Sequence, residues 1–355
     1  MNKASILESL DKVRKVTKNT DGIEGAVLLE AKNKILSMTG FNRFGITIKT
    51  WCDIYEESEW SCAVNALNLM MVLKQLPDDD ITIELSKEQL ILSGNFSKVE
   101  LRTFDLSLWP DLPQLNSPVK VRIQSRMVLE TAHATAKTGS GNSLNSSYHL
   151  VVAGGQSCIT TTDGFRFSIR GETENGGKKE VDAVIPSTFM GLTATVADDV
   201  DLEIDGDLLC ASFENVTIWG KTFPGMYYNI DKILNINPKT TVSTDLDELI
   251  NAIQLSMALI NKKDEWRILL DISRENGILV RNAGKTYGEA KSRVPAKVDG
   301  EDLKICFNGK FLLNALQTVP SDSPIVFTGQ TGLSVIRGVD NGLPFIEGIL
   351  PCRYA

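Results

Sequence analysis

Apolar and polar positions follow one pattern three times along the chain. In 63–85, 184–204 and 305–327, an apolar run at helical spacing ends in an acidic or proline-containing turn, and an alternating strand follows. The ends of the three apolar runs lie 120 and 123 residues apart, close to a third of the 355-residue chain. The pattern therefore predicts three tandem copies of one domain.

A second helical pattern opens each third of the chain. Two helices in each copy are therefore predicted, at 4–18 and 65–76, at 122–137 and 187–197, and at 245–263 and 308–319. The remaining segments leave room for about eight strands in each copy, which predicts an α+β fold. Proline-containing segments at 110–118 and 236–241 set the expected domains at 1–117, 118–238 and 239–355.

Composition excludes several classes of protein. The chain is 42% hydrophobic and 23% charged, which is typical of a globular protein. Its six cysteines show no C-x-x-C spacing, so we expect a reduced, intracellular protein without a disulfide framework or a cysteine-rich zinc site. The N-terminus has no apolar core of a signal peptide, and no run approaches 18 apolar residues, so neither secretion nor a membrane span is expected.

Charge is distributed unevenly along the chain. The net charge is −8, yet the six predicted helices sum to +5 and the remainder to −13. A basic helical layer within an acidic shell would attract a polyanion such as DNA. The alternative is that these charges are the solvated faces of amphipathic helices.

Catalytic motifs are absent from the sequence. It has no G-x-S-x-G and no H-E-x-x-H, and its acidic residues fall mostly in turns. We therefore expect no enzymatic activity, no cofactor and no metal. The alternative in this class is a metal-dependent hydrolase that uses Asp198, Asp199 and Asp201.

Four segments in order resemble the bacterial DNA polymerase III β subunit, the sliding clamp. They are ILSGNFSKVELRTFDLSLWPDLP (91–113), ITTTDGFRFSI (159–169), GKTFPGMYY (220–228) and EGILPCRYA (347–355). The resemblance covers the whole chain and implies the DNA clamp fold, closed as a ring by a head-to-tail homodimer with helices lining the channel.

The resemblance also implies a function. It implies a processivity factor that encircles duplex DNA without reading its sequence and tethers a replicative polymerase subunit and other replication and repair proteins through short peptides. The other implied partner is a clamp loader, the implied location is the bacterial cytoplasm at the nucleoid, and no membrane contact is implied. The alternative is a protein-interaction scaffold that does not encircle DNA.

Three sets of site residues are predicted. The resemblance implies a peptide groove at Leu150, Thr162, Gly164, Phe165, Arg166, Phe167, Pro224, Tyr228, Leu350, Pro351, Cys352 and Arg353. It implies a dimer interface at Val99, Leu101, Leu259, Ile260 and Trp266. Charge together with the resemblance assigns DNA-facing roles to Lys12, Arg14, Lys15, Lys18, Arg122, Arg126, Lys137, Tyr148, His149, Lys262 and Lys263.

Each set of residues also has an ordinary structural explanation, which stays open. Asp163-Gly164 is also a common strand-to-strand turn, and the last residues are also typical of a loose tail. The five interface residues would also suit an ordinary core. Phe165 and Cys352 depart from the family's usual histidine and longer apolar residue, so the sequence leaves the peptide preference open, while a groove is still expected.

Overall fold

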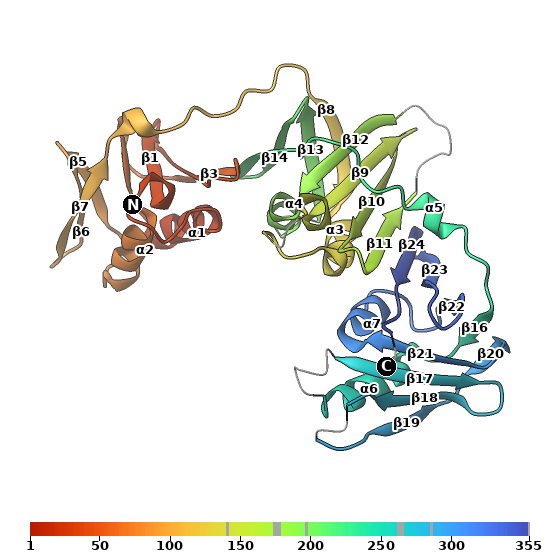
Figure 1. Cartoon of the computed structure of the whole chain (residues 1–355). Coiled ribbons are helices and arrows are strands. Elements are labelled where there is room, and N and C mark those ends of the chain that lie inside the picture. The colour runs from red at the N-terminus through yellow and green to blue at the C-terminus, as the bar shows by residue number, and fades with distance from the viewer. Residues whose placement is uncertain (140–141, 173–178, 196–197, 261–265, 285–286, 354–355) are drawn as a thin grey trace. The chain divides into compact units, whose positions relative to one another are not determined.

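The chain folds into two compact units. A computed structural model describes residues 1–139, 142–172, 179–195, 198–260, 266–284 and 287–353. Unit 1 contains residues 1–125 and 192–222, and unit 2 contains residues 126–191 and 223–355 (Figure 1). Among the described helices, none combines the length and the apolar character that a membrane span needs.

Unit 1 is built on one antiparallel sheet of eleven described strands. In spatial order they are β5 (Thr82–Ser86), β6 (Gln89–Ser93), β7 (Lys98–Phe104), β4 (Trp60–Asn65), β1 (Ala26–Lys32), β2 (Ile35–Phe41), β3 (Thr47–Asp53), β15 (Val216–Lys221), β14 (Leu208–Phe213), β13 (Asp199–Asp205) and β8 (Val119–Gln124). The pair β3 and β15, in register from Thr50 with Val216 to Thr47 with Trp219, joins the first third of the chain to the second.

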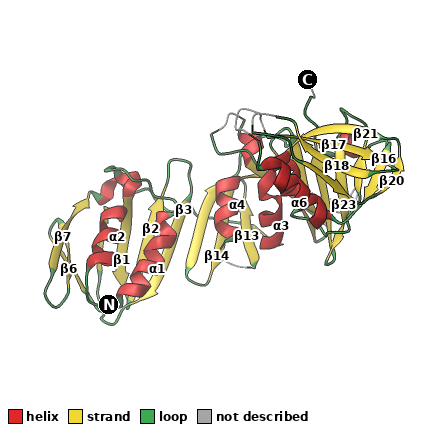
Figure 2. Ribbon diagram, turned by 90° about the horizontal axis from the view of Figure 1, so that it is seen from below, coloured by secondary structure: helices red, strands yellow, loops and turns green. Residues whose placement is uncertain are grey.

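Helices α1 (Lys3–Arg14) and α2 (Ala66–Gln75) lie side by side on this sheet (Figure 2). The side chain of Asn2 caps α1 by accepting a hydrogen bond from the Ser5 amide at 3.1 Å. Gly40 of β2 allows the close approach of α1, because a Cβ there would lie 2.4 Å from Cγ1 of Val13. The short 3-10 helix η1 (Ile23–Gly25) lies between α1 and β1, and η2 (Leu106–Leu108) lies between β7 and β8.

Unit 2 contains two sheets. The nine-stranded sheet has the order β12 (Lys179–Pro186), β9 (Ser147–Ala153), β10 (Gln156–Thr162), β11 (Arg166–Gly171), β24 (Leu343–Ile349), β23 (Ser334–Asp340), β22 (Ile325–Phe327), β16 (Thr240–Ser243) and β20 (Lys297–Gly300). The four-stranded sheet has the order β19 (Lys291–Val294), β18 (Gly277–Asn282), β17 (Arg267–Ser273) and β21 (Leu303–Asn308). The pair β11 and β24 joins the second third of the chain to the last.

The remaining helices belong wholly or mainly to unit 2. They are α3 (Ser125–Thr131), η3 (Ala132–Ala134), η4 (Ser143–Ser146), α4 (Ser187–Ala194), α5 (Asp231–Leu234), α6 (Leu246–Met257) and α7 (Gly309–Leu316). Leu249 and Ile253 of α6 and Leu312 of α7 are buried in one core with the four-stranded sheet. Burial of this apolar stripe is the main source of stability for such short helices.

The structure confirms the α+β fold and a helix at each of the six predicted places. The last residues of the predicted helices 187–197 and 245–263 lie outside the described residues. The division at 1–117, 118–238 and 239–355 stays a prediction, because the compact units follow the continuous sheets and not the repeat.

The described strands number seven, eight and nine in the three thirds, against the expected eight each. In the second and third copies a strand, β8 or β16, precedes the first helix. In the first copy this place before α1 has only an isolated bridge between Asn2 and Asp80 among the described residues. In the last third, Pro295 separates β19 from β20, and the chain passes there from one sheet to the other. Proline lacks the amide donor that a continuous strand would need.

Candidate functional site

Basic side chains gather at the C-terminal end of α1 in unit 1. The Nζ of Lys12 contacts Oε1 of Glu8 at 3.0 Å and Oδ1 of Asn215 at 3.2 Å, and Lys15 is exposed. Arg14 donates from Nη2 to Oδ1 of Asn19 at 3.0 Å. The predicted DNA contact Lys18 pairs with Glu24 at 2.5 Å. Lys15 is therefore the most accessible cation of this group.

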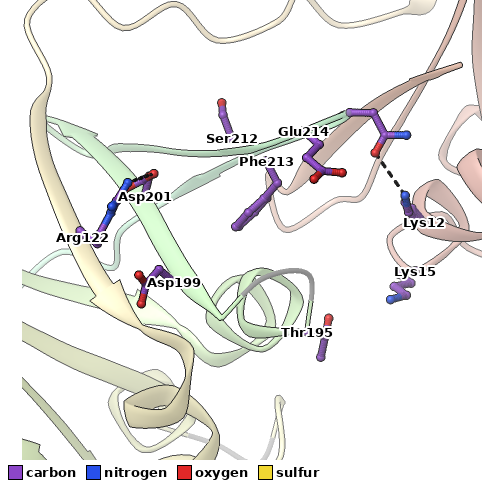
Figure 3. Close-up of a pocket in the computed structure, with 10 residues that line it drawn as sticks. Lys12, Lys15, Arg122, Thr195, Asp199, Asp201, Ser212, Phe213 and Glu214 are labelled. Atoms are coloured by element: carbon purple, nitrogen blue, oxygen red, sulfur yellow. Dashed lines mark hydrogen bonds and ion pairs between the residues drawn. The ribbon is translucent and has the colours of Figure 1, made fainter. Parts of the chain in front are cut away.

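A cavity of about 590 Å³ opens beside these lysines (Figure 3). Three cations and three carboxylates line it, among them Lys12, Lys15, Arg122, Asp199, Asp201 and Glu214. Arg122 donates from Nε and Nη2 to the two carboxylate oxygens of Asp201 at 2.6 and 2.8 Å, and this contact lowers the pKa of Asp201. The charges balance, so the cavity is a poor phosphate site, and Arg122 is already engaged.

The acidic residues 198–201 at this cavity offer no support for a metal site. In the ranges that the structure describes, no group of three His, Cys, Asp or Glu side chains is placed to hold a metal ion. The main-chain carbonyl of Asp198 accepts from the Ser125 amide at 2.8 Å, and Asp201 is paired with Arg122. Of the three acids in the hydrolase alternative, Asp201 thus has its carboxylate engaged by Arg122, whereas Asp198 makes its contact through the main chain.

Three predicted DNA contacts in unit 2 are engaged within the protein. Arg126 of α3 pairs with Glu130 at 2.5 Å and with Asp340. Tyr148 is buried, and its hydroxyl donates to the Val128 carbonyl at 3.1 Å. Nε2 of His149 lies 2.7 Å from Oδ1 of Asp182, and its ring stacks on that of Tyr227. The prediction of Tyr148 as a DNA contact was therefore wrong, because its ring fills the core.

Three further positions complete the predicted DNA set. Lys137 is exposed after η3. Lys262 and Lys263 lie outside the described residues. Of the predicted set, Lys15 and Lys137 are exposed, Arg122 is exposed but paired with Asp201, and Lys12, Arg14 and Lys18 are half-buried.

The turn from Thr162 to Arg166 presents an apolar side chain to solvent. Oδ1 of Asp163 accepts from the amides of Phe165 and Arg166 at 3.0 and 3.2 Å, and Gly164 has φ of +92°. Thr162 closes the turn by donating from Oγ1 to the Arg166 carbonyl at 2.7 Å. Asp163-Gly164 is thus a real strand-to-strand turn, and the ring of Phe165 beyond it is 63% exposed.

The C-terminal segment lies against this turn. The Leu350 amide donates to the Phe165 carbonyl at 2.9 Å, and the Cys352 amide donates to the Cys306 carbonyl at 2.7 Å. Leu350 is 44% exposed, while Pro351 and Cys352 are half-buried and Arg353 is exposed. Two main-chain hydrogen bonds therefore fix the segment through Cys352, which a loose tail would lack.

Phe311 of α7 completes this surface, although it is not among the groove residues predicted from the sequence. The Phe311 ring lies 6.4 Å from the ring of Phe165, and the guanidinium of Arg166 lies 4.1 Å from its centroid. Helical spacing placed Phe311 in a helix but gave no sign that the start of this helix meets β11. We call the surface of Phe165, Phe311 and Leu350 the candidate groove.

Other predicted groove residues lie beneath or beside this surface. Leu150, Thr162 and Phe167 are buried, and Phe167 packs with Ile230. Leu150 and Phe167 therefore do not form the exposed surface of the groove, because both side chains are buried. Pro224 and Tyr228 are exposed, and the Tyr228 hydroxyl donates to Oδ1 of Asn145 at 2.7 Å.

Unpaired strand edges lie near the predicted dimer residues. Strand β7 pairs with β6 along Lys98 to Arg102 but meets β4 only at its last two residues, so Val99 and Leu101 border an open edge. Strand β19 has β18 on one side and no described strand on the other. Exposed edges of this kind readily accept another chain.

The dimer residues predicted in the last third of the chain are less suited to an interface, because they are not exposed. Leu259 is half-buried, Ile260 is buried in the core with α6, and Trp266 packs against that core. Nζ of Lys310 lies 3.6 Å from the Trp266 ring centroid. Ile260 is thus a core residue, as the alternative interpretation of the five interface residues expected.

Family models match both ends of the chain. Residues 1–113 match the N-terminal domain of the DNA polymerase III beta subunit, and residues 231–341 match its C-terminal domain. A beta sliding clamp of Streptococcus pneumoniae is 23% identical over 376 aligned positions, covering 99% of this chain and 98% of the relative. The beta sliding clamp of Synechococcus elongatus is 25% identical and covers 82% of this chain and 80% of its own.

Solved structures share the fold along the whole chain. A putative DNA polymerase III beta subunit from Eubacterium rectale has a TM-score of 0.89 at 23% identity and covers 99% of this chain and 98% of its own. The sliding clamp of Bacillus subtilis has a TM-score of 0.89 at 21% identity and covers 100% and 98%. A sliding clamp of Pseudomonas aeruginosa bound to griselimycin has a TM-score of 0.87 at 19% identity and covers 100% and 98%.

Proposed function

Because the chain belongs to the DNA polymerase III beta subunit family, we propose that it is a sliding clamp, closed as a head-to-tail homodimer around duplex DNA. It performs no chemistry of its own. It tethers the replicative polymerase and other replication and repair proteins through peptides that bind the candidate groove. It acts at the nucleoid in the bacterial cytoplasm, where a clamp loader opens the ring.

One rule of strand pairing carries this proposal. In the first joint, β3 of the first copy pairs with β15, the last strand of the second copy. In the second joint, β11 of the second copy pairs with β24, the last strand of the third copy. The equivalent strands left over are β19 of the third copy and β7 of the first. Strand β19 lies at an edge of its sheet, and β7 pairs with β6 alone among the described strands until it meets β4 at Thr103.

The same rule supports closure between two chains. A third joint, between β19 of one chain and β7 of another, would repeat the geometry of the first two. Two such joints would arrange six copies head to tail, which closes only if the rotation per copy allows it. Val99 and Leu101 of β7 would then pack across the joint, while Lys98 and Arg102 would remain on its other face.

A closed ring gives long residence on DNA from weak contacts. Lys15 and Lys137 supply phosphate contacts that carry no sequence information. The ring prevents dissociation even when those contacts break. A polymerase peptide bound in the candidate groove keeps the enzyme at high effective concentration near the DNA.

The closure is tested by the mass of the chain in solution. We expect light scattering to give about twice 39.0 kDa. Leu101→Lys should give a folded monomer, because a charge at the joint would be buried without a partner. Ile35→Lys, at an exposed position inside the same sheet, is the matched control and should remain dimeric. A dimeric Leu101→Lys variant would contradict the placement of the joint.

A further inference from the structure

A buried guanidinium lies near the end of β11, the strand that begins next to Phe165 of the candidate groove. Arg170 of β11 is 1% exposed. Its Nε donates to Oε2 of Glu130 at 2.6 Å, its Nη1 to Oε1 of Glu347 at 2.7 Å, and its Nη2 to the Thr318 carbonyl at 2.9 Å. All three nitrogens of the fork are therefore engaged, each with a different element of unit 2.

The carboxylate of Glu347 is equally well satisfied. Glu347 of β24 is fully buried, and its Oε1 also accepts from Oγ of Ser168 at 2.6 Å and from Oγ1 of Thr318 at 3.3 Å. Its Oε2 lies 3.1 Å from Nε2 of His133. We call this group the Arg170 cluster; its members are Arg170, Glu347, Glu130, His133, Ser168 and Thr318.

The elements that meet at the cluster are those that form the candidate groove. Strand β11 begins next to Phe165, and β24 ends at Ile349, next to Leu350. Thr318 follows α7, the helix that carries Phe311. One guanidinium thus contacts β11, β24 and the carbonyl end of α7, and a cation is favourable at that end of a helix.

Stability alone does not account for such a cluster. Burying charged groups carries a large desolvation cost, and an apolar pair of similar volume is often as stable. A planar fork that donates in fixed directions does specify how three elements are placed relative to one another. Lysine would keep the charge but could not reach the three acceptors in that geometry.

We propose that Arg170 and Glu347 are positioning residues for peptide binding, which fix Phe165, Phe311 and Leu350 at the spacing that a partner peptide requires. The inference rests on the proposed function of the candidate groove. Neither residue touches the peptide. They act by holding β11, β24 and α7 in place, so that the groove does not have to be ordered when the peptide binds.

Two variants separate positioning from stability. Arg170→Lys keeps the charge and removes the fork, and the double variant Arg170→Met with Glu347→Leu replaces the pair with apolar groups. The matched control is Arg281→Met with Asp271→Leu, which removes a pair at 2.6 Å on β18 and β17, away from the groove. All are full-length proteins, studied well below their melting temperatures.

The measurement is the affinity of a fluorescein-labelled peptide with a Gln followed by spaced Leu and Phe. We expect both Arg170 variants to bind it about tenfold more weakly, because three groove side chains must then be ordered on binding. The apolar double variant should keep a melting temperature near that of the parent. The Arg281 control should bind the peptide with unchanged affinity.

Other outcomes have distinct meanings. Variants that melt earlier but bind the peptide with the parent's affinity would overturn the inference and leave a purely structural role. A parent protein that does not bind the peptide would overturn the proposed groove itself. Equal weakening in the Arg281 control would also overturn the inference, because the effect would then not depend on the Arg170 cluster.

Discussion

The joint between β3 and β15 and the joint between β11 and β24 use equivalent strands but different side chains. At the first joint, the neutral Asn215 donates to the Trp51 carbonyl at 3.1 Å and accepts from Nζ of Lys12. At the second joint, the charged Arg170 and Glu347 are buried side by side. Backbone pairing is therefore common to both joints, whereas among the described residues the buried charged side chains lie at the second.

This difference suggests a role for the buried ion pair of Arg170 and Glu347 other than connecting the two copies. The first joint shows that strand pairing with a neutral hydrogen bond is enough to connect two copies. The second joint carries the candidate groove, and there the fold accepts the desolvation cost of an ion pair. Buried charge thus accompanies the joint that carries the candidate groove.

The largest expected effect comes from breaking the second joint. Glu347→Ala leaves Arg170 buried with only Glu130 as an ionic partner, and the free energy of unfolding of unit 2 should fall by about 3–5 kcal/mol. Hydrogen exchange should show faster opening of β11 and β24 with unchanged protection of β3 and β15. A loss below about 1 kcal/mol would mean that the pair is not important to the joint.

The next effect concerns the groove at the same joint. Deleting residues 350–355 removes Leu350 and its hydrogen bond to Phe165, so partner peptides should lose about 2–4 kcal/mol of binding free energy. Calorimetric titration measures this loss directly. Dimer mass and melting temperature should change little. Equal affinity of the truncated and full-length chains would show that partners bind elsewhere.

A smaller effect is expected when the first joint is weakened. Asn215→Ala removes the hydrogen bonds to the Trp51 carbonyl and to Lys12, which should cost unit 1 about 0.5–1.5 kcal/mol. Urea unfolding followed by Trp fluorescence gives the value. A cost as large as that of Glu347→Ala would remove the contrast between the two joints.

The smallest effect concerns the accessible cations of the two units. Lys15→Glu in unit 1 and Lys137→Glu in unit 2 should each weaken DNA binding and lower the slope of log K against log salt by about 1. Arg122→Gln is the control, because Asp201 already neutralises Arg122. A salt slope that responds to Arg122 and not to Lys15 would place the DNA elsewhere.

Much of the fold was predictable because it depends on local patterns. Helical spacing located α6 and α7, and the repeat of about 120 residues predicted three copies of one domain. The strand joints were not predictable from this pattern. An alternating strand such as β3 shows which face is buried but does not show which strand lies beside it.

The site was only partly predictable, because a sequence shows where charged residues stand but not which residues they pair with in the fold. Arg126 looked like a DNA contact, yet it pairs with Asp340, which lies 214 positions away. Arg170 and Glu347 are 177 positions apart and have no motif of their own. Phe165 and Leu350 were found through short motifs, whereas Phe311 meets Phe165 only because the first turn of α7 packs at the start of β11.

The central claim is that the chain encircles DNA, and retention on circular and linear DNA tests it most directly. Clamps loaded by a bacterial clamp loader onto a nicked circular plasmid should co-elute with the plasmid through gel filtration in high salt, where simple electrostatic binding is screened. Cutting the plasmid once should release them within the run. Equal retention on circular and linear DNA, or none on either, would contradict the account.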